Sequence, residues 1–186
     1  MAESPLTSLM KKFGQEVVEK AMLNLGVYRT IRGKKRRAVA SDTLRKSLSF
    51  YYDGRSSKIQ FFAKGKAANY ADFVEQGVNG LTKNQSSPYS FRKKVVAINP
   101  IIEWMKIKPI RIRDKNGKIV KQTPSLIRSK AYAIAKGIAQ NGIPPLFYWR
   151  DAVNDTIIEF QPEFEAALTR EINLVIEDNL QKKIKI

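Results

Sequence analysis

The amino-acid sequence predicts an α+β protein, with elements in the order helix, hairpin, helix, insertion, helix and long helix. Apolar residues recur at three- and four-residue spacing near both ends of the chain, which is the period of an amphipathic helix. Between these ends, two runs rich in aromatic residues flank a short polar turn, as in an antiparallel hairpin. The 186 residues suit a single domain, 1–186, and 43% of them are hydrophobic, which is enough for a sizeable core.

The first predicted helix begins at Ser4 and Pro5, which have the residue types of an N-cap and a first helical position. Gly26 supplies its C-terminal end. One apolar stripe connects the two ends and consists of Leu6, Leu9, Met10, Phe13, Val17, Ala21 and Leu25.

A basic connector with little periodicity follows at 29–40, and Ser41 and Asp42 then have the residue types that cap a short helix leading to Leu44 and Leu48. Residues 48–52 and 58–63 predict a hairpin, because the intervening 53–57 has turn chemistry.

The next predicted helix, 67–76, ends at Gly77 and has an apolar face of Tyr70, Phe73 and Val74. Residues 77–94 are a polar loop, long enough to indicate either mobility or a role in contacts.

A short helix is predicted at 100–105, and 110–113 with 118–121 predict either a hairpin around Asn116-Gly117 or a basic loop. Pro124-Ser125 opens another helix, which Asn141-Gly142 closes. Its predicted apolar positions are Leu126, Ile127, Tyr132, Ile134, Ala135 and Ile138.

A long helical stretch then runs from Leu146 nearly to the end, broken or kinked at Pro162, and its tail at 182–186 is expected to fray. Its predicted apolar stripe consists of Phe147, Trp149, Ala152, Val153, Ile157, Phe160, Phe164, Leu168, Ile172, Val175 and Ile176.

The net charge of +17 is unevenly distributed. Residues 28–66 hold twelve bases against two acids, and 82–136 hold fourteen bases against two acids. Residues 137–180 reverse the sign, with eight acids against two bases. Such polarity favours pairing with copies of the same chain or contact with several partners, and it suits an assembly subunit at least as well as a nucleic-acid binder.

The composition argues against catalysis and cofactor binding. The chain has no His and no Cys, so it lacks the commonest general base, thiolate nucleophiles and Cys-based zinc ligands. No phosphate-binding glycine motif or nucleophile elbow occurs. The pairs Asp72–Glu75 and Asp151–Asp155 are better explained as solvated helix surface than as acid/base pairs. We also find no signal peptide and no apolar run of bilayer length. We therefore expect no cofactor, no metal, no membrane contact and no enzyme activity.

The basic run Lys34, Lys35, Arg36 and Arg37 has three open interpretations: phosphate neutralisation, docking to an acidic protein surface, or a solvated arm. A second candidate contact of the same kind comprises Arg92, Lys93 and Lys94.

Aromatic residues give two further candidates. Those of the hairpin, Phe50, Tyr51, Tyr52, Phe61 and Phe62, either stack nucleic-acid bases or pack in a buried sheet, and the second is the simpler interpretation. Phe147, Tyr148 and Trp149 suit a core or a subunit interface, where Trp and Tyr are enriched.

The segment Tyr70-Ala-Asp-Phe-Val-Glu-Gln-Gly77, preceded by a hairpin and an N-terminal helix, resembles a family of tailed-bacteriophage neck or tail-completion proteins, the head-to-tail connectors. In that family a Tyr-Ala-x-x-x-Glu-x-Gly segment follows the hairpin and a Pro-aromatic-x-x-Ala segment opens the last helix. Residues 145–152, Pro-Leu-Phe-Tyr-Trp-Arg-Asp-Ala, match the second motif with altered spacing. This chain departs from the family pattern in its long basic insertion at 77–145.

The resemblance implies an α+β connector-type domain, with an N-terminal helix and a long C-terminal helix packed on a small antiparallel sheet and repeated around a ring. It implies a structural virion protein that joins the portal to the tail and is assembled in the host cytoplasm. The expected partners are copies of the chain, portal or adaptor proteins and tail proteins. The candidate subunit-interface residues are Tyr70, Phe73, Glu75, Phe147, Tyr148 and Trp149. The alternative is a basic DNA- or RNA-binding accessory protein, and passing DNA is a further candidate partner.

Overall fold

The computed structural model describes residues 4–31, 34–37, 42–108, 110–113 and 116–184, with side chains at 28–41 and 178–184 outside the description. The fold is α+β, as predicted, and its long C-terminal helix packs with a small antiparallel hairpin. The elements are α1 (Pro5–Gly26), β1 (Tyr28–Ile31), β2 (Lys34–Arg37), α2 (Thr43–Ser47), β3 (Leu48–Asp53), β4 (Lys58–Ala63), a 3₁₀ turn η1 (Gly65–Ala67), α3 (Ala68–Gln76), α4 (Ile98–Ile107), α5 (Pro124–Asn141) and α6 (Tyr148–Ile184).

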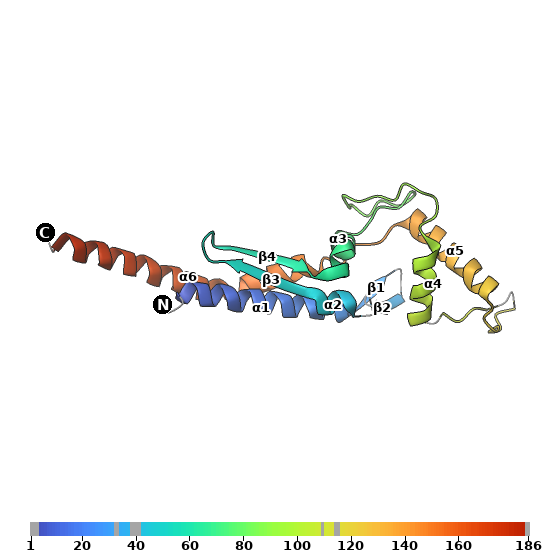
Figure 1. Ribbon diagram of the computed structural model, residues 1–186, viewed down its shortest axis with the longest axis horizontal. Helices are drawn as coiled ribbons and strands as arrows, with labels where there is room; N and C mark the ends of the chain where they lie inside the picture. Colours follow the sequence, from blue (N-terminus) through green and yellow to red (C-terminus); the bar gives the residue numbers. More distant parts are fainter. Residues whose placement is uncertain (1–3, 32–33, 38–41, 109, 114–115, 185–186) are drawn as a thin grey trace.

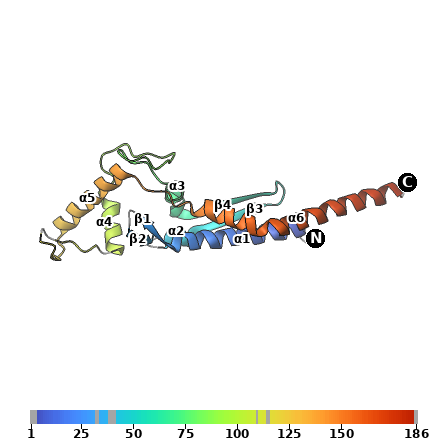
Figure 2. The same ribbon diagram turned by 180° about the vertical axis from the view of Figure 1, so that it is seen from behind.

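The molecule is elongated (Figure 1). Helices α1 and α6, the β3–β4 hairpin and α3 form the main body, while α4 and α5 form a lobe at one end of the long axis. The C-terminal part of α6 extends from the other end, past the N-terminus of α1, and the view from behind shows the same arrangement (Figure 2). The two ends of the molecule therefore present different elements to solvent.

Helix α1 forms as its sequence predicts. The Ser4 hydroxyl accepts a hydrogen bond from the Thr7 N–H at 3.2 Å, which satisfies one of the free N–H groups at the helix start. The predicted stripe is buried at Leu9, Phe13, Val17, Ala21 and Leu25, and the helix ends at Gly26.

The hairpin prediction is also confirmed. Strands β3 and β4 pair antiparallel, with Leu48 opposite Ala63 and Asp53 opposite Lys58. Leu48, Phe50, Ile59, Phe61 and Ala63 belong to the core or pack against it, so one face of the hairpin lies on the helices. Gly14 permits this approach, because a Cβ there would lie 2.5 Å from the Phe50 ring.

Helix α6 runs antiparallel to α1 and closes the core. Lys12 pairs with Glu163 at 3.0 Å, and the Asn24 amide donates to the Tyr148 carbonyl at 3.2 Å. Phe13 contacts Phe160 and Phe164 edge-on, with ring centroids 5.7 and 5.5 Å apart. These contacts make the α1–α6 pair the main packing surface of the chain.

Of the break or kink predicted at Pro162, the break is wrong, because α6 continues through this residue. A proline removes one helical hydrogen bond, and here it lies on the exposed side of a helix whose opposite side is fixed by the core.

Two predicted apolar faces are only partly confirmed. On α3, Val74 packs against the core as predicted, but the buried residue is Ala71, and Tyr70 and Phe73 are exposed. On α5, the predicted Ala135 is buried together with Ala131 and Ala139, whereas the larger Leu126 and Tyr132 are exposed. The predicted Ile127, Ile134 and Ile138 are half-buried. The fully buried positions of both helices are alanines, which let neighbouring backbones approach more closely than large side chains would.

The basic connector predicted at 29–40 contains strands, because β1 and β2 pair antiparallel with Tyr28 opposite Arg37. The sequence carries no alternation there, since β2 is four bases in succession. Among the described residues of 110–121, the hairpin considered there is represented by the bridge between Arg113 and Ile119. In the short helix α2, Asp42 precedes the first turn without a side-chain cap bond, and Ser41 lies outside the described residues.

Candidate functional site

The two motifs that carry the family resemblance meet at one place in the fold, which we call the junction and define as residues 74–80 and 142–150. Val78 and Ile143 exchange both backbone hydrogen bonds at 2.8 Å. The N–H groups of Leu146 and Phe147 donate to the carbonyls of Val74 and Glu75 at 3.1 and 3.0 Å. The junction therefore connects α3, the α4–α5 lobe and the start of α6.

Glycines make the junction close-packed. A Cβ on Gly80 would lie 2.2 Å from the Gln140 carbonyl oxygen, and a Cβ on Gly142 would lie 2.3 Å from that of Val78. Gly142 also has φ +72°, which disfavours other residues. The backbones approach so closely that side chains do not fit between them, and this fixes the path of the chain from the lobe into α6.

Glu75 caps the start of α6 from a distant point in the sequence. Its carboxylate accepts hydrogen bonds from the N–H groups of Trp149 at 2.9 Å and Arg150 at 3.0 Å. Phe147 directly precedes the helix at φ 50°, and the Arg150 guanidinium lies 3.6 Å from the centre of its ring. A carboxylate at this position stabilises the helix through both hydrogen bonds and the helix dipole.

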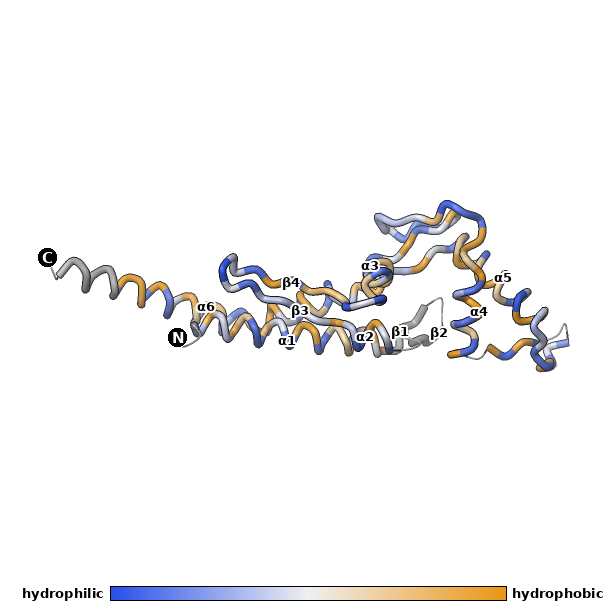
Figure 3. The backbone as a smooth tube through the Cα atoms, in the orientation of Figure 1, coloured by the Kyte–Doolittle hydropathy of each residue, from blue (hydrophilic) through white to orange (hydrophobic). Residues whose placement is uncertain are grey.

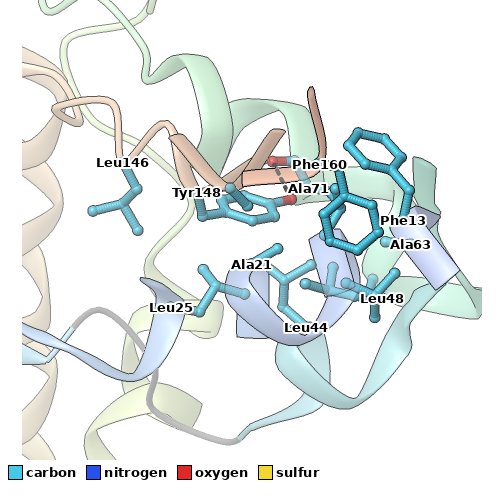
Figure 4. Close-up of a cluster of buried hydrophobic side chains, with 14 of the residues drawn as sticks. Phe13, Ala21, Leu25, Leu44, Leu48, Ala63, Ala71, Leu146, Tyr148 and Phe160 are labelled. Atoms are coloured by element: carbon cyan, nitrogen blue, oxygen red, sulfur yellow. Dashed lines mark hydrogen bonds between the residues drawn. The ribbon is translucent and has the colours of Figure 1, made fainter. Parts of the chain in front are cut away.

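Tyr148 is fully buried below this cap, among Leu25, Leu44 and Ala71 (Figure 4). Its hydroxyl donates to the Ala71 carbonyl at 3.4 Å. Burial, followed by the charges of Glu75 and Asp72, raises the pKa of Tyr148 far above its ordinary value. A fully buried side chain belongs to the core of its own subunit, so Tyr148 is not available as an interface residue in this conformation.

The other candidate interface residues divide by exposure. Trp149 is half-buried, and its ring centroid lies 5.3 Å from that of Phe61. Tyr70 and Phe73 are exposed at 38% and 41%, although the Phe73 ring meets the Tyr89 ring edge-on at 4.7 Å. The structure thus brings Glu75, Phe147, Tyr148 and Trp149 together at the junction and leaves Tyr70 and Phe73 on the adjacent surface.

The polar loop at 77–94 is held by its own side chains. The side-chain oxygen of Asn79, Oδ1, accepts from the Gln85 N–H at 2.7 Å, and the side-chain nitrogen Nδ2 donates to the Ser87 carbonyl at 2.6 Å. The Gln85 amide in turn donates to the Asn141 carbonyl at 2.7 Å, which ties the loop to the end of α5. Of the two roles considered for this loop, these bonds favour the contact role over mobility.

The predicted basic sites lie on different elements. Arg92, Lys93 and Lys94 are exposed in the loop before α4. Lys34, Lys35, Arg36 and Arg37 form β2, and their side chains lie outside the described residues. Further exposed bases lie on or beside α4 and α5, namely Lys83, Lys106, Lys108, Arg111, Arg113, Lys118, Lys121, Arg128, Lys130 and Lys136. The charge of this lobe is visible in the sequence, whereas its position at one end of the molecule depends on the fold.

Within the described residues there is no cluster of three or more acidic side chains placed to hold a metal ion. Asp72 and Asp155 are exposed, and Glu75 is used as the helix cap. None of the helices in that part of the chain combines the length and hydrophobicity needed to cross a membrane.

Comparisons with protein-family models, with curated proteins and with solved structures find no match to this chain.

Proposed function

We propose that this chain is a structural subunit of the neck of a tailed bacteriophage, where copies form a ring that joins the portal to the tail. The observation that carries the proposal is the apolar surface that the subunit leaves uncovered. Helix α6 continues past the end of α1 with Ile172, Leu174 and Val175 about 60% exposed. Exposed apolar surface of this extent is typical of proteins that are completed by a partner.

The arrangement of motifs supports the phage assignment. The Tyr70–Gly77 segment and the residues that open α6, which together resemble the neck and tail-completion family, form one hydrogen-bonded junction. An elongated subunit with different elements at its two ends also suits heterologous contacts, which close into rings when the rotation between neighbours permits.

The proposal is tested in the phage that encodes this chain. Virions carrying a peptide tag fused to Ile186 are decorated with an antibody and imaged. We expect label at the neck alone, and we expect particles that lack the chain to separate into filled heads and free tails. Label on the capsid or tail fibres, or normally joined particles without the chain, would refute the assignment.

The exposed bases of the α4–α5 lobe favour a second candidate function, a DNA- or RNA-binding accessory protein. Such a protein would bind duplex or single strands with an affinity that falls steeply and linearly on a log–log plot against salt. A variant with Arg92, Lys93 and Lys94 changed to Gln should then show a smaller slope. If binding is absent at moderate salt, this second function is excluded.

A further inference from the structure

Helix α6 is covered by α1 along only part of its length. The pair Lys12–Glu163 sets the antiparallel register of the two helices. Helix α1 begins at Pro5, seven residues before Lys12, so its cover ends about seven residues after Glu163, near Arg170. The rest of α6 lies beyond α1, as both views show (Figures 1 and 2).

The uncovered part of α6 keeps the apolar pattern of the covered part. Leu168, at the edge of the covered part, and Ile172 and Val175 beyond it follow Phe160 and Phe164 at helical spacing, and all three are exposed. Hydrophobic residues continue along this stretch of α6 past the N-terminus (Figure 3). We call residues 168–177 the distal stripe. A helix that extends the stripe of a packed core without cover lacks a partner element.

The β3–β4 hairpin also has an apolar surface that no element of the chain covers. Its inner face packs on the helices, and its outer face carries Tyr51 and Phe62, which are 58% and 40% exposed. Since Ser49 pairs with Phe62 and Tyr51 pairs with Gln60, the two aromatic side chains are diagonal neighbours across the strands. We call this surface, formed by Ser49, Tyr51, Asp53, Lys58, Gln60 and Phe62, the outer hairpin face.

The charges on the two surfaces are complementary. Glu171 lies beside the apolar row of the distal stripe, one helical turn from both Leu168 and Val175. At the outer hairpin face, Lys58 and the neighbouring Arg55 and Lys64 are exposed. The acid in that face, Asp53, is engaged by the turn, because it accepts bonds from the Arg55 N–H at 3.0 Å and the Ser56 hydroxyl at 2.6 Å.

The same charges argue against a symmetric pairing of two distal stripes. Such a pair would place Glu171 of one copy beside the same surface of the other copy, where like charges repel and a carboxylate at the contact lacks a cation. The outer hairpin face supplies aromatic surface and bases together. A chain cannot make this contact with its own hairpin, since its α6 packs with α1 in the core on the inner side.

We propose that the distal stripe of one copy docks on the outer hairpin face of the next copy, in a head-to-tail contact between identical chains. The hairpin would then have helices on both faces, its own on one side and a neighbour's on the other. This inference rests on the proposed ring function and names the surfaces through which neighbours meet.

The absence of native cysteine in the sequence makes a crosslinking test direct. Val175→Cys is introduced in one tagged chain and Phe62→Cys in a second chain of different size. The two are mixed and treated with a short bis-maleimide, as purified proteins and again in assembled particles. Asn173→Cys is the matched control, because Asn173 is exposed on the same turn of α6 but points away from the stripe.

We expect the Val175→Cys chain to crosslink to the Phe62→Cys chain several-fold more than the Asn173→Cys chain does. Predominant crosslinks between two Val175→Cys chains, or yields equal to the control in both preparations, would overturn the inference. If the antibody label is found at the neck but the crosslink does not form, this contact is refuted and the proposed function is not. The crosslink in a chain that is absent from the neck refutes the proposed function and leaves the contact standing.

Discussion

The cap that Glu75 places on α6 is a specific test of the junction, because the two ends of the contact are more than seventy residues apart in the sequence. Replacing Glu75 by Ala removes both acceptor oxygens from the N–H groups of Trp149 and Arg150. It also removes a negative charge from the positive end of the helix dipole. The start of α6 would then expose two free donors beside the core residue Tyr148.

The expected cost follows from these bonds. Hydrogen bonds to a charged group contribute about 1.5–3 kcal/mol, and losing an N-cap costs about 0.5–2 kcal/mol. The terms overlap, so we expect Glu75→Ala to lower the free energy of unfolding by roughly 2–3 kcal/mol, or about 5–10 °C in Tm for a chain of this size. Glu75→Gln keeps one acceptor and loses the charge, so its cost should lie between that of Glu75→Ala and zero.

Urea unfolding, followed by helical circular dichroism and by the fluorescence of Trp104 and Trp149, measures this loss. Glu103→Ala is the matched control, since Glu103 is an exposed helical glutamate bonded to Lys106 at 2.8 Å. An exposed pair of this kind contributes only about 0.3–0.5 kcal/mol. If Glu75→Ala and Glu103→Ala destabilise the chain equally, the capping argument is wrong.

Three further changes test the fold. Gly142→Ala should destabilise the chain by roughly 2–4 kcal/mol, because the new Cβ would meet the Val78 carbonyl and because φ at this position is +72°. Gly137→Ala lies on open helical surface and should stabilise the chain by about 0.5–1 kcal/mol. Thermal unfolding of the two variants compares these effects. Burial raises the pKa of Tyr148 above its ordinary 10.0, so the folded state keeps the hydroxyl neutral at pH values where the unfolded state ionises. The free energy of unfolding should therefore fall as the pH rises above about 10. Urea titrations should show a steeper fall for the wild type than for Tyr148→Phe, and equal slopes would contradict this. Pro162→Ala should restore a helical hydrogen bond and stabilise α6 by about 1–3 kcal/mol, seen as a higher Tm, and an unchanged or lower Tm would argue against it.

The sequence predicted the elements whose signals are local. The Ser4 cap, the stripe of α1, the turn between β3 and β4 and the stop at Gly77 each depend on residues close together in the chain. Periodicity also located α5 and placed Ala135 on its buried face, but it favoured the large Leu126 and Tyr132 over Ala131 and Ala139. Which face a helix buries depends on how closely its neighbour approaches, and that distance is not encoded in the helix itself.

The contacts of the junction were beyond sequence reasoning for the same physical reason. Glu75 was predicted as an interface residue or part of a solvated acidic pair, and nothing near it in the chain indicates that it caps α6. Tyr148 was grouped with Phe147 and Trp149, although only Tyr148 is fully buried. A left-handed residue at Phe147 turns the chain between them, so three consecutive aromatics face three different environments.

The junction separates the basic part of the subunit from the acidic part. The basic α4–α5 lobe and the acidic, apolar distal stripe lie at opposite ends of one elongated subunit, and the junction is where the chain passes from the first into the helix that carries the second. Close-packed glycines and the Glu75 cap restrict motion at this point. In the contact proposed between copies, the distal stripe and the outer hairpin face both belong to the main body, so the core of α1, α6 and the hairpin would determine whether successive copies close into a ring or continue as an open helix. The junction would instead set the angle at which the basic lobe projects from each copy.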